Sequence, residues 1–270
     1  MISFLQVIET LKYQGMNLYL RTSAVSTPPH LVCSGFLPEG MRTAAPGTIL
    51  YQDSASSPQP LSAEHQQKDA EMQEVIDQFQ EAYPDIIFEA DWDDSQVNAV
   101  SWIDNSGQMH VKAYGGILHS KYVESEGLSL VLAHEVGHLL GGPPYHEGRT
   151  RVHPFGAGHN NMSAEGQADY YGASVVMRNM ADLYGYDYET MTTEGIDQLH
   201  NLFHYGIEGA SKECNYPPDG VFASCHCPVY LGCDYPPVDC RIETYVDAEK
   251  GEPKPVCAGP IEHLYMEIAV

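Results

Sequence analysis

The stretch that decides the fold is Leu130–Gly142, which has the sequence LVLAHEVGHLLGG. In a helix, residues four positions apart lie on one face, so His134 and His138 can present two imidazole nitrogens to a single metal ion. Glu135 then lies beside that ion and can take a proton from a bound water. This H-E-x-x-H pattern predicts a zinc-binding helix.

The residues around the motif support a helix that is buried on one side. Apolar residues recur four, four and three positions apart and form one face: Leu128, Leu132, Val136 and Leu139. Gly141-Gly142 and then Pro143-Pro144 predict the end of the helix, because glycine can adopt left-handed backbone angles and proline cannot continue the hydrogen-bonding pattern.

Two histidines leave a catalytic zinc site incomplete, because three protein ligands hold the ion and water takes the fourth position. A third histidine ten residues after the first is excluded, since Pro144 stands there. The segment 163–169 offers a carboxylate instead. Ser163 is a candidate N-cap, and Glu165 and Asp169 lie four positions apart on one helical face.

The order HEVGH and then E-x-x-A-D resembles the gluzincin zinc peptidases, most closely their compact branch with the E-x-x-A-D form. The resemblance covers about Asn98–Ala181 and includes the strand-and-loop segment that precedes the metal-binding helix. One departure is the glycine of Gly166-Gln167 inside the second motif, because glycine weakens a helix slightly.

This resemblance implies a role for each matching residue. His134, His138 and Glu165 would bind one Zn²⁺ per chain. Glu135 would be the general base, and Asp169 would support a ligand histidine, as carboxylates commonly do for metal-bound imidazoles. The implied fold is α+β and zincin-like, with a small mixed sheet, a metal-binding helix and a glutamate helix.

Two strands joined by a turn are predicted just before the metal-binding helix. Val97–Ile103 and Gln108–Tyr114 flank Asp104-Asn105-Ser106-Gly107, which has the composition of a hairpin turn. In the resembling peptidases a strand here forms the edge of the sheet, and the substrate adds to it as a further strand. The residues expected at this substrate edge are Met109, His110 and Val111.

Three further histidines are candidates for contacts with the substrate or the transition state. His146 and His159 lie in a long loop from Pro143 to Met162, and long loops in compact domains often carry function. One of them could donate a hydrogen bond to a developing oxyanion. His204 follows His200 by four residues, and two solvated histidines are the preferred interpretation of that pair.

Composition restricts the partners. The chain has 270 residues, 43% of them hydrophobic, which is enough to form a sizeable core. Its 37 acidic and 13 basic residues give a formal net charge of −24, which repels nucleic acid and anionic membranes. The apolar runs are too short to span a bilayer. We therefore expect a protein or peptide substrate, with no nucleic acid partner and no membrane span.

Six of the seven cysteines lie between Cys214 and Cys257, in a segment rich in proline. Such a cluster predicts a disulfide framework and hence a periplasmic or extracellular location, although residues 1–20 contain no recognisable signal peptide. Cys33 is expected to pair with this cluster or to stay free. A third hypothesis is that its thiolate caps the zinc before activation.

The sequence thus predicts three segments: an N-terminal extension (1–61), a zincin-like metallopeptidase domain (62–210) that begins with a helix over Ser62–Tyr83, and a cysteine-rich C-terminal segment (211–270). The expected activity is zinc-dependent endopeptidase hydrolysis. Two alternatives are a zinc hydrolase of non-peptide amides, such as cell-wall cross-links, and a non-catalytic zinc-containing binding protein. The presence of Glu135 argues against the last, because a structural zinc site needs no base.

Overall fold

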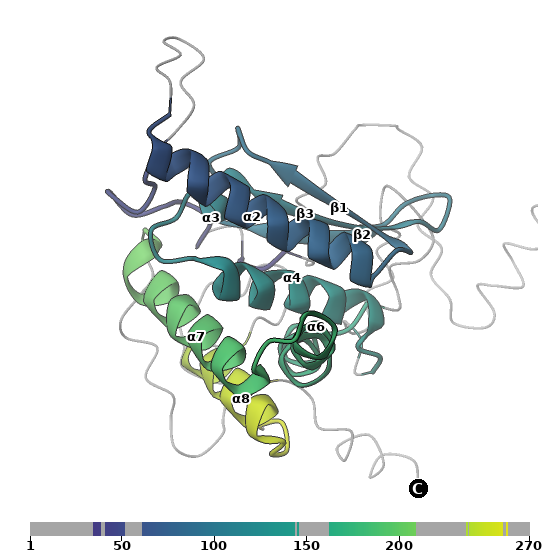
Figure 1. Ribbon diagram of the computed structural model, residues 1–270. Coiled ribbons are helices and arrows are strands. Elements are labelled where there is room, and N and C mark those ends of the chain that lie inside the picture. The colour runs from purple at the N-terminus through teal and green to yellow at the C-terminus, as the bar shows by residue number, and fades with distance from the viewer. Residues whose placement is uncertain are drawn as a thin grey trace, which may run out of the picture.

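The structure is a computed structural model that describes residues 35–38, 41–51, 61–143, 145, 162–208, 236, 238–255 and 258. These residues form a three-stranded sheet and a set of helices, most of them following the sheet in the chain (Figure 1). The predicted α+β class is confirmed. Among the described residues, no helix is both long enough and apolar enough to cross a membrane.

Helix α2 (Ala63–Ala82) confirms the first predicted helix. Its N-cap is Ser62, whose hydroxyl accepts a hydrogen bond from the backbone N–H of His65 at 3.2 Å. The helix ends before Pro84, as expected from the effect of proline on the preceding residue. The side chains that it buries are Met72, Val75, Ile76 and Phe79.

The sheet contains β1 (Ile86–Asp91), β2 (Ala99–Ile103) and β3 (Met109–Tyr114), in the spatial order β1-β3-β2. β3 runs parallel to β1 and antiparallel to β2. The hairpin turn between β2 and β3 has Gly107 at φ +88°, a conformation that glycine adopts without strain.

The predicted substrate edge was wrong. Met109, His110 and Val111 belong to β3, which is the central strand and is hydrogen-bonded on both sides. The hairpin places β2 and β3 side by side, and it is β3 that pairs with β1. The strand at the edge of the described sheet on this side is therefore β2.

Helices α2 and α4 (Ser125–Leu140) cover the same face of the sheet (Figure 1). Phe88, Val111 and Ser101 are register partners and share that face. The ring of Phe79 in α2 lies 5.7 Å from that of Phe88, and Ser101 contacts α4. The opposite face carries Trp102, whose ring stacks on His110 at 4.7 Å.

Helix α4 is buried on every side over Gly127–His138, whereas the sequence predicted burial on one side only. The reason is that the sheet covers one side of α4 and later helices cover the others. The predicted end of the helix is confirmed: Gly141 is its C-cap, and Gly142 has φ +72°.

The first of the remaining helical elements contacts β3 beside the sheet, and most of the others pack against α4 (Figure 1). They are α3 (Gly115–Leu118), α5 (Glu165–Tyr171), the π-helical turn η4 (Gly172–Val176), α6 (Met177–Tyr184), α7 (Tyr188–Asn201), the π-helical turn η5 (Leu202–Gly206) and α8 (Val238–Lys250). α5 and α7 both pack against α4, and α8 packs against α5 and α7. α7 begins at Tyr188, because Asp187 caps it by accepting a hydrogen bond from Thr190 N–H at 2.9 Å.

Parts of both outer segments contribute to the same core. Phe36 and Leu37 are buried, and the backbone N–H of Phe36 donates to the carbonyl of Ala99 in β2 at 2.8 Å. At the other end of the chain, α8 buries Tyr245 completely. Cys240 is buried and disulfide-bonded, and the other cysteines, Cys33 among them, lie outside the described residues.

Candidate metal centre

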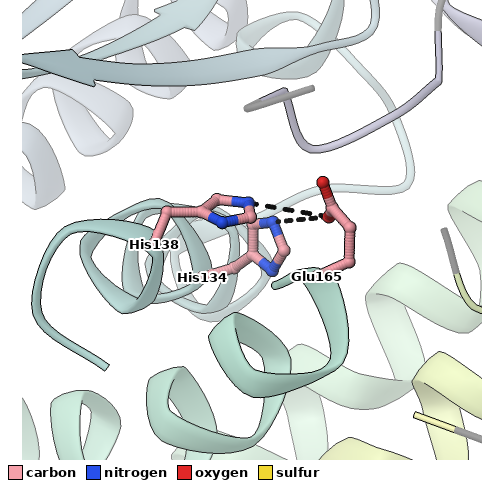
Figure 2. A group of neighbouring side chains, drawn as sticks. All are labelled: His134, His138 and Glu165. Atoms are coloured by element: carbon pink, nitrogen blue, oxygen red, sulfur yellow. Dashed lines mark ion pairs between the residues drawn. The ribbon is translucent and has the colours of Figure 1, made fainter. Parts of the chain in front are cut away.

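Three side chains from two helices converge on one point. His134 and His138 lie on α4, and Glu165 is the first residue of α5. The Nε2 atoms of the two imidazoles lie 3.4 and 3.6 Å from Glu165 Oε2, as the dashed lines in Figure 2 show. Two ligand atoms that are each about 2.1 Å from a tetrahedral ion are about 3.4 Å apart. These two distances therefore fit ligand atoms that share one metal ion.

The cluster is fully buried. Among the described residues it is the one group of three or more His, Cys, Asp or Glu side chains whose ligand atoms converge, all within 4.8 Å of one another. The Nε2 atom of His134 has no hydrogen-bond partner there, which is unusual for a buried nitrogen. A bound cation would satisfy it, so this group can hold a metal ion.

Hydrogen bonds fix the orientation of both imidazoles. His138 Nδ1 lies 2.8 Å from the carbonyl oxygen of Ser163, and His134 Nδ1 lies 2.7 Å from Asp169 Oδ1. A carbonyl oxygen can only accept, so Nδ1 of His138 carries the proton and donates it. The lone pair of its Nε2 atom is then available to a metal ion.

Asp169 is held as a carboxylate by its neighbours. Burial opposes its ionisation, but the Arg241 guanidinium and His134 keep the pKa of Asp169 at about 2. Arg241 donates from Nε to Oδ2 at 2.9 Å and from Nη2 to Oδ1 at 2.8 Å. The hydroxyl of Tyr245 also donates to Oδ1. His134 therefore faces an ionised acceptor that three side chains share.

Glu135, the residue after His134, is a buried carboxylate with only one of its two oxygens hydrogen-bonded among the described residues. Its Oε2 accepts a hydrogen bond from Ser101 Oγ at 2.7 Å, and its Oε1 has no hydrogen-bond partner among the described residues. Burial raises the pKa of Glu135, while the two ligand histidines and Ser101 oppose that rise. A carboxylate with a raised pKa takes up a proton more readily.

Glycines allow α4 and α5 to approach closely enough to bring the ligands together. A Cβ atom on Gly137 would lie 2.4 Å from the carbonyl oxygen of Ala168, so no larger residue fits there without displacement. A Cβ atom on Gly166 would lie 1.6 Å from the carbonyl oxygen of Ala258. Gly166 weakens a helix slightly, but a larger residue at this position would clash with Ala258.

The expected cap of α5 was wrong. Its N-cap is Ala164, and the Ser163 hydroxyl donates instead to the carbonyl oxygen of Gly142 at 2.7 Å. This bond, together with the one between Ser163 and His138, joins the end of α4 to the start of α5. Ser163 thus helps to set the relative position of the ligands rather than capping the helix.

The other candidate residues either lie away from the ligand cluster or fall outside the described residues. His110 lies on the outer face of the sheet against Trp102. His204 lies in η5, with Nε2 3.4 Å from Asp239 Oδ1 of α8 and its ring centroid 4.4 Å from that of His200. It is not part of the ligand cluster. His146 and His159 lie outside the described residues.

Sequence reasoning missed three residues that contact the site. Of these three, only Ser101 could have been found from the sequence. The alternation of side chains along β2 places it on the same face as the buried Ala99. Arg241 and Tyr245 lie in the segment that was interpreted through its cysteines, about seventy residues after the motifs that they contact. No local pattern indicates that α8 reaches Asp169.

Comparisons of the chain with protein-family models, with curated proteins and with solved structures found no match.

Proposed function

We propose that this protein is a zinc-dependent endopeptidase. The observation that carries the proposal is the convergence of His134, His138 and Glu165, with the buried carboxylate of Glu135 beside them. Two histidines and one glutamate are a donor set of catalytic zinc sites, in which the fourth position is left for water or substrate. The resemblance of both motifs to the gluzincin peptidases supports the same conclusion.

Zinc held by these ligands would polarise the scissile carbonyl and lower the pKa of water. The remaining chemistry belongs to Glu135. Ser101 holds Oε2, so Oε1 is the atom that would take the proton from the attacking water and later deliver it to the leaving amine. Asp169 and Ser163 keep the two imidazoles in place throughout.

A purely structural role for the metal is less well supported. A structural zinc site needs no base, yet the buried carboxylate of Glu135 lies next to these three ligands.

The test combines metal content with hydrolysis. Elemental analysis of the wild-type protein should find one zinc per chain, and Glu165→Ala should lose it. A mixture of peptides should be cleaved by the wild type and protected by a chelator. Glu135→Gln should retain zinc and lose hydrolysis, since the amide cannot act as a base. A wild-type protein without zinc, or a fully active Glu135→Gln variant, would refute the proposal.

A further inference from the structure

A buried arginine on the C-terminal helix contacts the carboxylate that supports His134. Arg241 of α8 is 2% exposed, and it donates two hydrogen bonds to Asp169, one to each carboxylate oxygen. We infer that Arg241 is a positioning residue for the metal centre. It orients Asp169, and through Asp169 it directs Nε2 of His134 toward the ligand cluster. This inference rests on the metal site proposed above and adds a residue to it.

The paired contact between Arg241 and Asp169 fixes the plane of the carboxylate. Nε and Nη2 of Arg241 lie 2.9 and 2.8 Å from Oδ2 and Oδ1, so the two planar groups meet in a fork. Oδ1 is also the atom that lies 2.7 Å from His134 Nδ1. A rotation of the carboxylate would therefore break contacts on both sides at once.

The guanidinium of Arg241 is itself held by parts of the chain that are distant in sequence. Its Nη1 donates to the carbonyl oxygen of Phe36, and its centre lies 4.7 Å from the Phe36 ring centroid and 5.5 Å from that of Phe203. Nη2 also donates to the hydroxyl of Tyr245 at 3.3 Å. These contacts hold the guanidinium in the position from which it orients the carboxylate of Asp169.

The geometry around His134 explains how the arrangement selects one tautomer. Nη2 of Arg241 lies 3.3 Å from His134 Nδ1, and both of these atoms approach Asp169 Oδ1. A guanidinium has donors only, so Oδ1 is the shared acceptor for both groups. This leaves the proton of His134 on Nδ1 and its lone pair on Nε2, which faces Glu165 at 3.4 Å.

A contribution to stability alone does not explain the arrangement well. A buried ion pair can often be replaced by apolar residues without loss of stability, because the pair must first be removed from water. Partners of metal-bound histidines, by contrast, typically change metal affinity 10- to 100-fold when they are lost. These two roles predict different measurements.

The experiment measures zinc affinity of the metal-free protein by competition with a chromogenic chelator, with thermal unfolding of each metal-free variant measured in parallel. Arg241→Met should weaken zinc binding by about 10- to 100-fold. Arg241→Lys should restore part of the affinity, since lysine keeps the charge but cannot form the fork. The matched control is Thr244→Val: Thr244 is also buried on α8, but its hydroxyl donates to the carbonyl oxygen of Cys240 rather than to Asp169. Its zinc affinity should equal that of the wild type.

A double-mutant cycle tests whether Arg241 acts through Asp169. In an Asp169→Asn background, Arg241→Met should weaken zinc binding by less than about threefold, because the group that it orients has already been altered. An effect of full size in that background would overturn the inference. So would an Arg241→Met protein that is folded and binds zinc like the wild type. If Arg241→Met does not fold, Arg241→Lys and Tyr245→Phe take its place, and wild-type affinity in both would overturn it.

The outcomes separate this inference from the proposed function. A wild type that binds no zinc would refute both. Zinc binding that depends on Arg241 in a protein that cleaves no peptide would support the inference and count against the peptidase. Zinc binding and cleavage that are both insensitive to Arg241 would leave the peptidase standing without this positioning residue.

Discussion

Replacing Ser101 with alanine tests the proposed base without touching any metal ligand. The Ser101 hydroxyl donates to Glu135 Oε2 at 2.7 Å, and both side chains are completely buried. The substitution removes one oxygen atom and leaves the backbone pairing of β2 unchanged. Glu135 would then lose the hydrogen bond that holds its Oε2 atom.

The expected loss of kcat follows from the strength of the hydrogen bond between Ser101 and Glu135. Hydrogen bonds to charged groups contribute about 1.5–3 kcal/mol. Each ~1.4 kcal/mol corresponds to a factor of ten in rate. If the orientation of Glu135 in the transition state depends on Ser101, kcat should fall by about 10- to 100-fold. KM should change little, because Ser101 contacts Glu135 and not the substrate.

The assay is chelator-sensitive peptide hydrolysis under saturating substrate, with zinc content measured on the same samples. Ser129→Ala is the matched control, since Ser129 is also buried but donates to the carbonyl of Ser125 within its own helix at 2.7 Å. Zinc content should stay at one per chain in both variants. A Ser101→Ala protein with the wild-type kcat would refute the role of Ser101. An equal loss in Ser129→Ala would show that the effect is not specific to Glu135.

Three further predictions concern stability. Removing zinc with a chelator should lower the midpoint of thermal unfolding, and restoring zinc to 1,000 times its Kd should return about 4 kcal/mol; an unchanged midpoint would contradict binding to the folded state. Gly166→Ala should destabilise the protein by at least 1–3 kcal/mol in chemical denaturation, because its Cβ would lie 1.6 Å from the carbonyl oxygen of Ala258, and Gln167→Ala provides the neighbouring control. The pKa of Asp169 is about 2 in the folded protein and near 3.8 ordinarily, so the carboxylate stabilises the metal-free fold above about pH 4. That contribution, about 2 kcal/mol, should be lost as the pH falls toward 2, and Asp169→Asn should remove this part of the acid dependence.

The elements with local signals could be predicted from the sequence. The spacing of His134 and His138 and the glycines after them identified α4 and its end. Ser62 and Pro84 marked the limits of α2, and Gly107 marked the hairpin. In each case the information lies within a few residues of the element.

The order of the strands could not be predicted, because it depends on a pairing between β1 and β3 that no local pattern records. Alternation along a strand shows which side chains face the core, but it does not show which edge is covered. The substrate edge was predicted on β3 for this reason, whereas the structure shows β3 as the central strand of the described sheet.

Only the residues within the two motifs of the candidate site could be predicted from the sequence. The contacts of Asp169 with Arg241 and of Glu135 with Ser101 join residues 72 and 34 positions apart. Both depend on how whole elements are packed. An arginine in α8 has the same local sequence context whether it faces solvent or a buried carboxylate, so the sequence alone gives no reason to choose.

The contact between Arg241 and the carbonyl of Phe36 spans 205 positions of the chain. During synthesis on the ribosome, the metal-binding helix and Asp169 emerge long before the arginine that neutralises Asp169. Domains begin to fold as they emerge, so a nascent chain that ends before α8 would have to bury this carboxylate without its cation or leave that region unfolded. Stable metal loading would therefore wait for α8, and a ribosome stalled before Val238 should carry a chain that cannot retain zinc.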